Sequence, residues 1–444
     1  MSGMSENKIL SAFIQKLQEK TARIGIIGLG YVGLPLLEAF SRKGFAVTGV
    51  DINPERIQQL QRAESYIQDI PNPMLAQVCA QASTLFTTDF SSLSACDAII
   101  ICVPTPLRKS KEPDISYILS AAEKIAEFLH PGHLVILEST TYPGTTDEIL
   151  LPLFQAKGLD IGKDFMLAFS PERIDPGNQS FQVSDIPKVV GGVTQACTTA
   201  AEKLYHQVME KVHIVSSARV AETSKILENT FRSVNIALVN EFAGICRTLG
   251  VDIWEVIDAA ATKPFGFMKF LPGPGIGGHC IPLDPHYLIW KSRLHGYEPR
   301  FMALAEQINS GMPREVLQLI VEALNGIKKS LNGSKILILG VAYKPDIDDV
   351  RESPALELIQ LLWSKGAQVA YYDPFVSELQ IEKQRLNSIE ISEGLLKTFD
   401  CGVVITHHSK GVDYSQFCKE IPLWVDTRNA LRECQTENTH ILWL

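Results

Sequence analysis

One cysteine of this chain lies in a glycine-rich segment that would place its thiol for reaction. Segment 273–284 reads GPGIGGHCIPLD, so Cys280 follows four glycines and precedes the carboxylate of Asp284 by four positions. Glycine permits positive φ and lets a ligand come close to the backbone. Because a thiolate is a strong nucleophile, the pattern predicts covalent chemistry at Cys280, whereas a buried free cysteine in a tight turn is the alternative.

Charged and amide side chains recur on a helical pattern over residues 217–249. Lys225, Asn229 and Arg232 are spaced by four and three residues, so they share one face of the expected helix. That face lies between apolar positions and could line a cleft. A solvated polar stripe has the same spacing and is the alternative.

A glycine pattern after an apolar run near the N-terminus is typical of dinucleotide binding. Gly28, Gly30 and Gly33 lie between a strand candidate and a helical pattern, the context that a pyrophosphate-binding turn requires. Asp51 ends the next strand candidate, where its carboxylate could bind a ribose diol and would repel a 2′-phosphate. The sequence therefore predicts NAD rather than NADP. The predicted contacts are Gly28, Gly30, Tyr31, Val32, Gly33, Asp51 and, near the adenosine, Arg56.

Two hydroxyl-rich loops follow further strand candidates. Ligands of open parallel sheets bind beyond the carboxyl ends of the strands, so VPTP (103–106) and ESTTYPGTT (138–146) are expected beside the nicotinamide. Simple turn chemistry is the alternative for each threonine. The predicted cofactor contacts in these loops are Val103, Pro104, Thr105, Ser139 and Thr140.

Other charged residues are candidates for acid–base work or for binding an anionic group. Glu172 and Arg173 supply an acid and a base after another strand candidate. Lys344, Arg351 and Arg428 could offer positive charge to a diphosphate, whose oxygens match guanidinium groups well. Each of these three residues, taken alone, is more typical of a surface cation.

The elements that must position these residues form two similar α/β patterns. Apolar runs that end in glycine begin near Ile24 and Lys335, and each leads to a helical pattern and a second run that ends at an aspartate. Such strand–helix–strand order predicts parallel sheets. The sequence predicts two Rossmann-like parallel-sheet domains joined by a long central helical region. The expected domains are 1–215, which would bind NAD, a helical dimerisation region at 216–324 that carries the cysteine loop, and 325–444.

Composition bounds the classes of partner and compartment. The 444 residues include 45% hydrophobic and 20% charged residues, and the formal net charge of −9 argues against nucleic acid or an acidic membrane as partner. Nine cysteines without a CxxC pair argue against a disulfide framework and a structural zinc site. Cys280 and His286 lack a second ligand pair, so no metal is expected. Neither a signal peptide nor a membrane span is recognised, and a cytoplasmic protein is predicted.

Together these motifs resemble the nucleotide-sugar dehydrogenases, the UDP-glucose/GDP-mannose dehydrogenase family. The likeness extends from about Ala22 to Arg432. It implies an N-terminal NAD domain, a C-terminal UDP domain and a helical middle that forms a homodimer or higher oligomer. It rests on GLGYVGLP (28–35), VPTP, ESTTYPGTT, FSPER (169–173), the Lys225/Asn229 helix, GPGIGGHCIPLDP (273–285) and GVAYKPDIDDVRESP (340–354).

The resemblance also implies a reaction, in which the C6 alcohol of a UDP-sugar becomes a carboxylate at the expense of two NAD. Cys280 would capture the aldehyde as a thiohemiacetal, and the resulting thioester would be hydrolysed by water. Lys225 would stabilise oxyanion character, Asp284 and Asn229 would hold a water or orient Lys225, and Thr140 would lie near that water. Glu172 would be the base. The implied substrate contacts are Glu172, Arg173, Lys225, Asn229, Arg232, Gly275, Gly277, Lys344 and Arg428, whereas Arg351 lies on the cofactor side.

Three segments are similar to the branch of the family that acts on N-acetylated UDP-hexosamines. They are SPERIDPGN (170–178), ATKPFGF (261–267) and GGHCIP, in which His279 precedes the cysteine. UDP-N-acetylglucosamine is the expected substrate, with UDP-N-acetylmannosamine or UDP-glucose as alternatives. A two-electron hydroxyacid dehydrogenase and a non-catalytic nucleotide sensor are the competing classes. Lys263 or Pro264 stands where some family members place a cross-subunit arginine, so that contact is not expected here.

Overall fold

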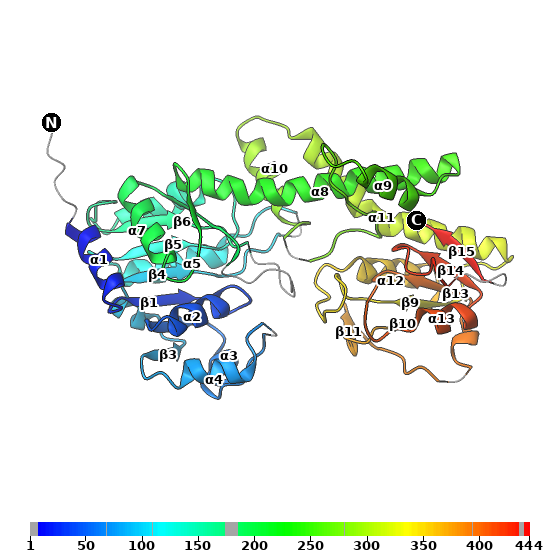
Figure 1. Cartoon of the computed structure of the whole chain (residues 1–444), viewed down its shortest axis with the longest axis horizontal. Coiled ribbons are helices and arrows are strands. Elements are labelled where there is room, and N and C mark those ends of the chain that lie inside the picture. Colours follow the sequence, from blue (N-terminus) through cyan, green and yellow to red (C-terminus); the bar gives the residue numbers. More distant parts are fainter. Residues whose placement is uncertain are drawn as a thin grey trace. The chain divides into compact units, whose positions relative to one another are not determined.

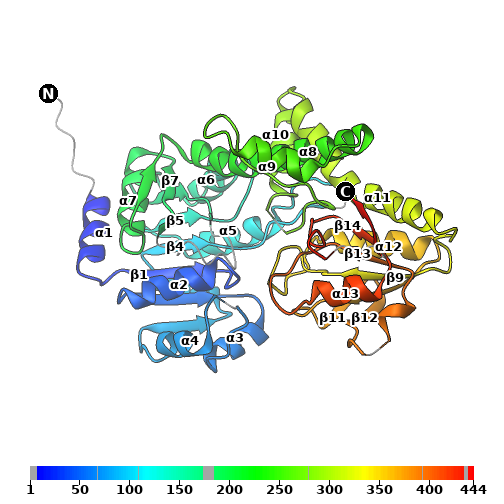
Figure 2. The ribbon, with the colours of Figure 1, turned by 45° about the vertical axis from the view of Figure 1, so that its right-hand side comes forward.

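The structure is a computed structural model that describes residues 8–67, 69–108, 110–173, 185–278, 280–392, 394–434 and 439–444. It divides into two compact units (Figures 1 and 2). The first consists of Met1–Glu228 and His286–His295, and the second of Asn229–Pro285 and Gly296–Leu444. The chain passes from one unit to the other inside the helices α8 (Ala218–Leu249) and α10 (Asp284–Leu294).

The described residues of the first unit form an eight-stranded sheet in the order β3-β2-β1-β4-β5-β6-β7-β8. Strands β1 to β6 are parallel, β7 runs antiparallel to β6, and β8 is parallel to β7. The strand order reverses beside β1, which is where open parallel sheets bind dinucleotides. The strands are β1 (Arg23–Ile27), β2 (Ala46–Val50), β3 (Thr84–Thr87), β4 (Ala98–Ile101), β5 (Leu134–Leu137), β6 (Met166–Phe169), β7 (Lys188–Gly192) and β8 (Val212–Ile214).

Helices cover both faces of this sheet because neighbouring residues of each strand point to opposite faces. In β4, Ile100 belongs to one buried core, whereas Ile99 and Ile101 belong to the other. The first core contains α1 (Lys8–Gln18), α2 (Gly33–Arg42), α3 (Pro54–Gln61), α4 (Asn72–Cys79) and α7 (Gln195–Tyr205). The second contains η1 (Phe90–Ala95), α5 (Ser116–Phe128), the π-helix η2 (Thr145–Leu150), α6 (Leu151–Gln155) and the start of α8.

The described residues of the second unit form a five-stranded parallel sheet in the order β10-β9-β13-β14-β15. Its core holds α11 (Arg300–Gly326) and α12 (Pro354–Ser364), and a further cluster holds α13 (Tyr414–Glu420). A separate antiparallel hairpin pairs β11 (Glu378–Ile381) with β12 (Gln384–Asn387). The remaining elements are α9 (Ile253–Ala261), β9 (Lys335–Leu339), β10 (Gln368–Tyr372), η4 (Leu396–Thr398), β13 (Cys401–Val404), β14 (Leu423–Asp426) and β15 (His440–Trp443).

The architecture confirms the predicted fold class, two parallel-sheet α/β domains with a long helical region between them in the sequence. The reversed direction of β7 and the β11–β12 hairpin were not part of that prediction. Within the described part of the chain, none of the helices combines the length and the apolar character that crossing a membrane requires. The bounds of the three predicted domains and the cytoplasmic location stay predictions.

Candidate active site

The turn after β1 has the shape of a nucleotide-binding turn. Gly28 has a φ of +89°, and a Cβ at this position would lie 2.6 Å from the carbonyl oxygen of Cys102. At Gly33, the first residue of α2, a Cβ would lie 1.9 Å from the carbonyl oxygen of Gly28. The fold of the turn itself therefore requires glycine at both positions.

Gly30 differs from these two glycines because the space beside it is open. A Cβ at Gly30 would have no atom of the described residues within 4 Å. Val32 is the N-cap of α2 and makes no side-chain cap hydrogen bond, although the N–H of Leu34 already donates to the carbonyl of Gly30 at 3.1 Å. An open approach to the backbone at a helix N-terminus fits the pyrophosphate of NAD.

Asp51 lies buried at the end of β2, where it holds the same turn. Its Oδ2 accepts the N–H of Leu29 at 3.0 Å, and its Oδ1 accepts the N–H of Asn53 at 2.9 Å. Arg56 Nη1 lies 3.5 Å from Asp51 Oδ2, which brings together two of the predicted cofactor residues. Sequence reasoning missed Tyr66, whose hydroxyl donates to the carbonyl of Leu29 at 2.6 Å and whose pKa is raised, mainly by burial.

The predicted hydroxyl loops meet at the carboxyl edge of this sheet. Ser139 Oγ donates to the carbonyl of Val103 at 2.8 Å and so ties the loop after β5 to the loop after β4. Tyr287 of α10 donates its hydroxyl to the carbonyl of Thr105. Thr140 is half-buried beside Ser139. The carboxyl ends of neighbouring strands therefore bring these separate motifs to one place.

Glu222 of α8 fixes the second half of the ESTTYPGTT loop. This buried carboxylate accepts the N–H of Gly144 at 2.5 Å, and the N–H and hydroxyl of Thr146 at 2.9 and 2.7 Å. Burial raises the pKa of Glu222 to about 7, although the three hydrogen bonds oppose that shift. Sequence reasoning missed Glu222, whose only visible signal is its position three residues before Lys225 on the same helix.

The glycine loop before Cys280 lies closely against two residues of the second unit. A Cβ at Gly277 would lie 2.4 Å from the Cβ of Tyr343, and one at Gly273 would lie 2.3 Å from Arg428 Nη1. Gly275 and Gly278 have φ of +133° and +82°. The half-buried Cys280 accepts the N–H of Asp284 at its carbonyl oxygen at 2.8 Å, which forms the turn that begins α10. Tyr343 was not predicted.

A chain of hydrogen bonds leads from this turn to α8. Asn229 donates its side-chain N–H to Asp284 Oδ2, and Arg232 donates to Asn229 Oδ1. Asn229 and Asp284 are each 1% exposed, so this is a buried polar pair rather than a solvated stripe. Lys225, 7% exposed, precedes Asn229 by one turn of the same helix.

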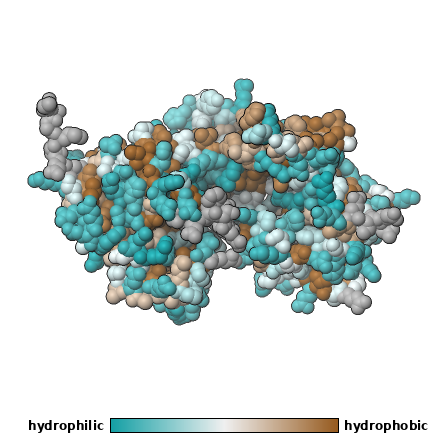
Figure 3. Space-filling view, in the orientation of Figure 1, coloured by the Kyte–Doolittle hydropathy of each residue, from teal (hydrophilic) through white to brown (hydrophobic). Residues whose placement is uncertain are grey.

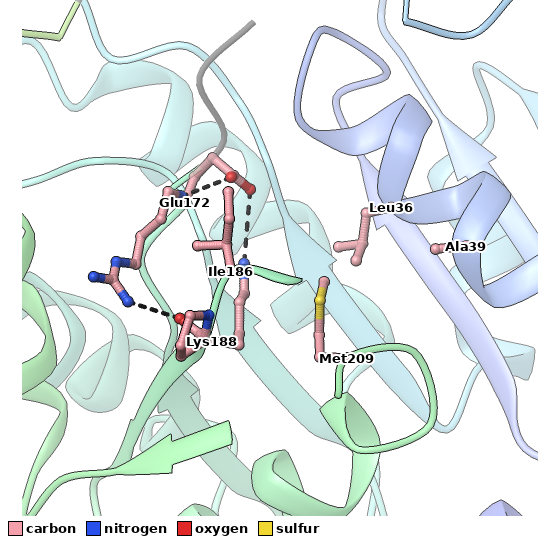
Figure 4. Close-up of a pocket in the computed structure, with 8 residues that line it drawn as sticks. Leu36, Ala39, Glu172, Ile186, Lys188 and Met209 are labelled. Carbon is pink, nitrogen blue, oxygen red and sulfur yellow. Dashed lines mark hydrogen bonds and ion pairs between the residues drawn. The ribbon is translucent and has the colours of Figure 1, made fainter. Parts of the chain in front are cut away.

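Glu172 belongs to a buried ionic cluster that sequence reasoning did not recognise (Figure 4). Lys188 Nζ lies 2.9 Å from Glu138 Oε2 and 3.6 Å from Glu172 Oε2. Tyr205 donates its hydroxyl to Glu138. Glu172 also accepts the N–H of Arg173 at 2.6 Å, and the Arg173 side chain pairs with Glu228 at 2.9 Å rather than with a solvent ion.

In the second sheet, Asp373 occupies the place that Asp51 has in the first. Its Oδ2 accepts the N–H groups of Val341 and Ala342 at 2.7 and 3.2 Å. His408 accepts the N–H of Asp346 at Nδ1, so its Nε2 carries the proton and donates to Asp373 at 3.0 Å. Burial alone would raise the pKa of Asp373, but these hydrogen bonds lower it below the usual value.

The remaining predicted cations differ in their surroundings. Arg428 donates Nε to the carbonyl of Ile405 at 3.0 Å, and burial lowers its pKa to about 10. Arg351 forms hydrogen bonds with both carboxylate oxygens of Asp349 and is exposed. Lys344 is half-buried in the loop after β9. Both arginines lie at the cysteine loop, Arg428 with its side chain beside Gly273 and Arg351 with its carbonyl oxygen, which accepts the N–H of Gly278 at 2.9 Å.

Models of three family domains match the chain in sequence order. Residues 22–209 match the NAD binding domain of the UDP-glucose/GDP-mannose dehydrogenase family, residues 219–311 its central domain, and residues 337–433 its UDP binding domain. The chain belongs to this family. The predicted family, the predicted class of enzyme and the predicted cofactor NAD are thereby confirmed.

Relatives and solved structures match most of the length of this chain. A UDP-N-acetyl-D-glucosamine 6-dehydrogenase of Pseudomonas aeruginosa is 37% identical over 361 residues, 81% of this chain and 84% of the relative. A UDP-N-acetyl-D-mannosamine dehydrogenase of Methanococcus maripaludis is 34% identical over 433 residues, 95% and 94% of the two chains. The solved UDP-D-ManNAc dehydrogenase of Pyrococcus horikoshii has a TM-score of 0.87 and 33% identity, and the match covers 95% of this chain and 98% of that one.

These comparisons establish an NAD-dependent UDP-sugar dehydrogenase and leave the individual site residues as predictions. His279 and residues 174–178 of the SPERIDPGN segment lie outside the described residues. Among the described side chains, no group of three or more His, Cys, Asp or Glu residues is arranged to hold a metal ion.

Proposed function

We propose that this dehydrogenase oxidises the C6 alcohol of a UDP-N-acetylhexosamine, with UDP-N-acetylglucosamine as the first candidate, to the carboxylate. The observation that carries the proposal is the thiol of Cys280, which stands four residues before a buried carboxylate paired with Asn229. Oxidation of an alcohol to a ketone needs no nucleophile, whereas oxidation through an aldehyde benefits from covalent capture of that aldehyde. Relatives named for N-acetylated UDP-hexosamines support this substrate class.

Lys225 would act on the C6 oxygen in the first oxidation. Its ammonium group stabilises the negative charge that develops on this oxygen as the alcohol proton leaves. Bound NAD accepts one hydride from C6 in each of the two oxidations. Cys280 then adds to the aldehyde, so that a bond forms between sulfur and C6 while the thiol proton passes to the carbonyl oxygen. Loss of a proton and a second hydride converts this thiohemiacetal into a thioester on Cys280.

Glu172 would be the base that completes the reaction. It takes a proton from a water molecule, whose oxygen bonds to the thioester carbon, and the carbon–sulfur bond breaks with the sulfur leaving as a thiolate. Asp284, Asn229 and Thr140 would hold that water or orient Lys225. The balance is one alcohol, two NAD⁺ and one water consumed, and one carboxylate, two NADH and three protons released.

Charged groups and glycine backbone would bind the UDP moiety and its sugar. We assign the diphosphate to Lys344 and Arg428, and the sugar to backbone at Gly275 and Gly277, with Arg173 and Arg232 as further contacts. The close packing of this loop supports the assignment, because a Cβ at Gly277 would displace Tyr343 and a Cβ at Gly273 would displace Arg428. Arg351 is assigned to the cofactor side.

A second copy of the chain is the proposed partner of the central helices. Leu238, Phe242, Ile245 and Leu249 of α8 are each 45–69% exposed and recur at spacings of three and four residues. Figure 3 shows hydrophobic surface over this part of α8 and α9. An apolar stripe of this kind is typical of a helix that packs against another protein surface.

The decisive experiment measures NADH formed per sugar with a panel of UDP-sugars. Two NADH per UDP-N-acetylglucosamine is the expected result, and one NADH per sugar contradicts the proposal. The product would be a nucleotide-linked uronic acid, the form in which such sugars enter polysaccharide synthesis. We expect Cys280→Ser to lose steady-state formation of the carboxylate, whereas Cys434→Ser, which alters another half-buried cysteine, should retain it. Full activity of Cys280→Ser would exclude the thioester.

UDP-N-acetylmannosamine is the second candidate substrate. The relative from Methanococcus maripaludis named for this sugar matches 95% of the chain, against 81% for the glucosamine relative, at a similar identity. The two sugars differ only in the configuration at C2. The ratio of kcat/KM for the two substrates in the same panel decides between them.

A further inference from the structure

Lys188 is buried with two carboxylates at that edge of the first sheet where the sheet is expected to bind its nucleotide. Glu138 directly follows β5, and Glu172 follows β6 by three residues. Lys188 begins β7, and because β7 runs antiparallel to β6, its first residue rather than its last lies at this edge. The reversed strand therefore supplies a cation at the carboxyl ends of its neighbours.

The contacts of Lys188 are close and excluded from solvent. The side chain of Lys188 is 6% exposed, that of Glu138 is 0% exposed, and that of Glu172 is 14% exposed. Lys188 Nζ lies 5.2 Å from the centre of the Tyr205 ring, and Tyr205 also donates to Glu138. A buried charge is tolerated only when it is paired and hydrogen-bonded, and these contacts meet that requirement for Lys188.

The cluster keeps Lys188 charged. Burial opposes its charge, but Glu138 and Glu172 outweigh burial and raise the pKa of Lys188 above its usual value. Burial raises the pKa of Glu138 even though Lys188 opposes the shift. The Tyr205 hydroxyl has a pKa well above the usual value, chiefly through burial, so it remains a donor. The buried thiol of Cys102 is a further titratable group near the cluster, and burial raises its pKa as well.

Glu172 and Lys188 both line a small cavity (Figure 4). The cavity has a volume of about 20 Å³, which is enough for a single water molecule. Arg173 lines it as well, and the remaining lining residues are apolar. The apolar lining residues are Leu36, Ala39, Ile186, Pro187 and Met209. One carboxylate thus touches both a buried ammonium group and a space of the size of a water.

We infer that Lys188, held by Glu138 and Tyr205, is a positioning residue for Glu172 that fixes the direction of its carboxylate for thioester hydrolysis. The inference rests on the proposed function, in which Glu172 removes a proton from the attacking water. Lys188 Nζ lies 3.6 Å from Glu172 Oε2 and 2.9 Å from Glu138 Oε2, so the second carboxylate holds the ammonium group in the place from which it attracts Glu172. Without that ammonium group, the carboxylate of Glu172 would lose the contact that sets its direction.

A purely structural role is the competing explanation, since removal of Lys188 leaves Glu138 buried without its cation. Two variants separate the explanations. Lys188→Met removes the charge at similar length, and the double variant Lys188→Met/Glu138→Gln also removes the buried carboxylate that would be left unpaired. Lys163→Met, at an exposed lysine whose side chain is 77% accessible, is the matched control.

The experiment follows NADH in a single turnover and in the steady state, together with thermal unfolding. We expect both Lys188 variants to release two NADH in the first turnover. Their steady-state kcat should then be lower than that of the wild type by at least about tenfold, because hydrolysis becomes limiting, with little change in KM. The double variant should regain the thermal midpoint of the wild type, and Lys163→Met should match the wild type throughout.

The inference is overturned if the double variant has the kcat of the wild type, because Lys188 would then only neutralise Glu138. It is also overturned if Lys188→Met is indistinguishable from the wild type. Should Lys188→Met fail to fold, the double variant alone provides both comparisons. A wild-type protein that forms no second NADH refutes the proposed function, and the inference with it, so the two failures are distinguished by the wild-type trace.

Discussion

Gly30→Ala should remove NAD binding while leaving the fold intact. A methyl group at this position meets no atom of the described residues within 4 Å, and the backbone of Gly30 is outside the positive-φ range. We therefore expect the free energy of unfolding to change by no more than about 0.5 kcal/mol. The methyl group would, however, occupy the approach of the pyrophosphate to the backbone. A loss of at least tenfold in NAD affinity, about 1.4 kcal/mol, is expected.

Two further glycines supply the controls for this prediction. Gly33→Ala places a Cβ 1.9 Å from the carbonyl oxygen of Gly28 and should lower the free energy of unfolding by about 1–3 kcal/mol. Gly244→Ala, in the middle of α8, has open space like Gly30 and should stabilise the protein by up to about 1 kcal/mol without affecting NAD. Calorimetric titration with NAD and thermal unfolding measure both quantities. An unchanged dissociation constant for Gly30→Ala would refute the assigned position of the pyrophosphate.

Two more predictions concern stability and assembly. Burial raises the pKa of Glu222 to about 7, so the folded protein holds a proton there that the unfolded chain loses near pH 4.5. The protonated Glu222 therefore contributes to the free energy of unfolding at acid pH, and this contribution is lost as the pH rises toward 7. This contribution amounts to about 3 kcal/mol at most, and Glu222→Gln should abolish its pH dependence. Parallel curves of thermal midpoint against pH for the wild type and Glu222→Gln would contradict the raised pKa of Glu222. Phe242→Asp should halve the mass measured by light scattering. Ile52→Asp, at a 72% exposed isoleucine outside the apolar stripe of α8, should leave the mass unchanged. An unchanged mass for Phe242→Asp would argue against α8 as the dimer surface.

Much of the fold could be predicted because the informative signals are local. Each strand of the first βαβ unit is a short apolar run, and glycines or an aspartate mark its end, so the elements follow from adjacent residues. The same holds for α8, whose predicted range over 217–249 differs from Ala218–Leu249 by one residue. The spacing of Lys225, Asn229 and Arg232 likewise follows from helix geometry alone.

The features that were missed depend on contacts between distant parts of the chain. The direction of β7 is not encoded in its apolar pattern, because a buried strand has the same pattern in either direction. From the sequence, Lys188 is an ordinary cation at the start of a strand. Its burial depends on Glu138 and Glu172, which only the fold brings beside it. Glu222 has no local signal because its partners, Gly144 and Thr146, lie more than seventy residues away.

The two aspartates at the ends of β2 and β10 differ in how many acceptor sites remain on them. A carboxylate offers about four lone-pair positions. Asp373 accepts from four backbone N–H groups, those of Val341, Ala342, Phe375 and Val376, and from the imidazole of His408 as well. Its acceptor capacity is thus fully used.

Asp51 accepts from the N–H groups of Leu29 and Asn53 and has an ion pair with Arg56, which leaves acceptor positions for the hydroxyls of a ribose. A chain with two related nucleotide folds must direct its cofactor to one of them. Because the acceptor positions of Asp373 are occupied, the second fold offers no carboxylate at this position for an adenosine ribose, and hydrogen bonds within the protein would favour this ribose at the first fold.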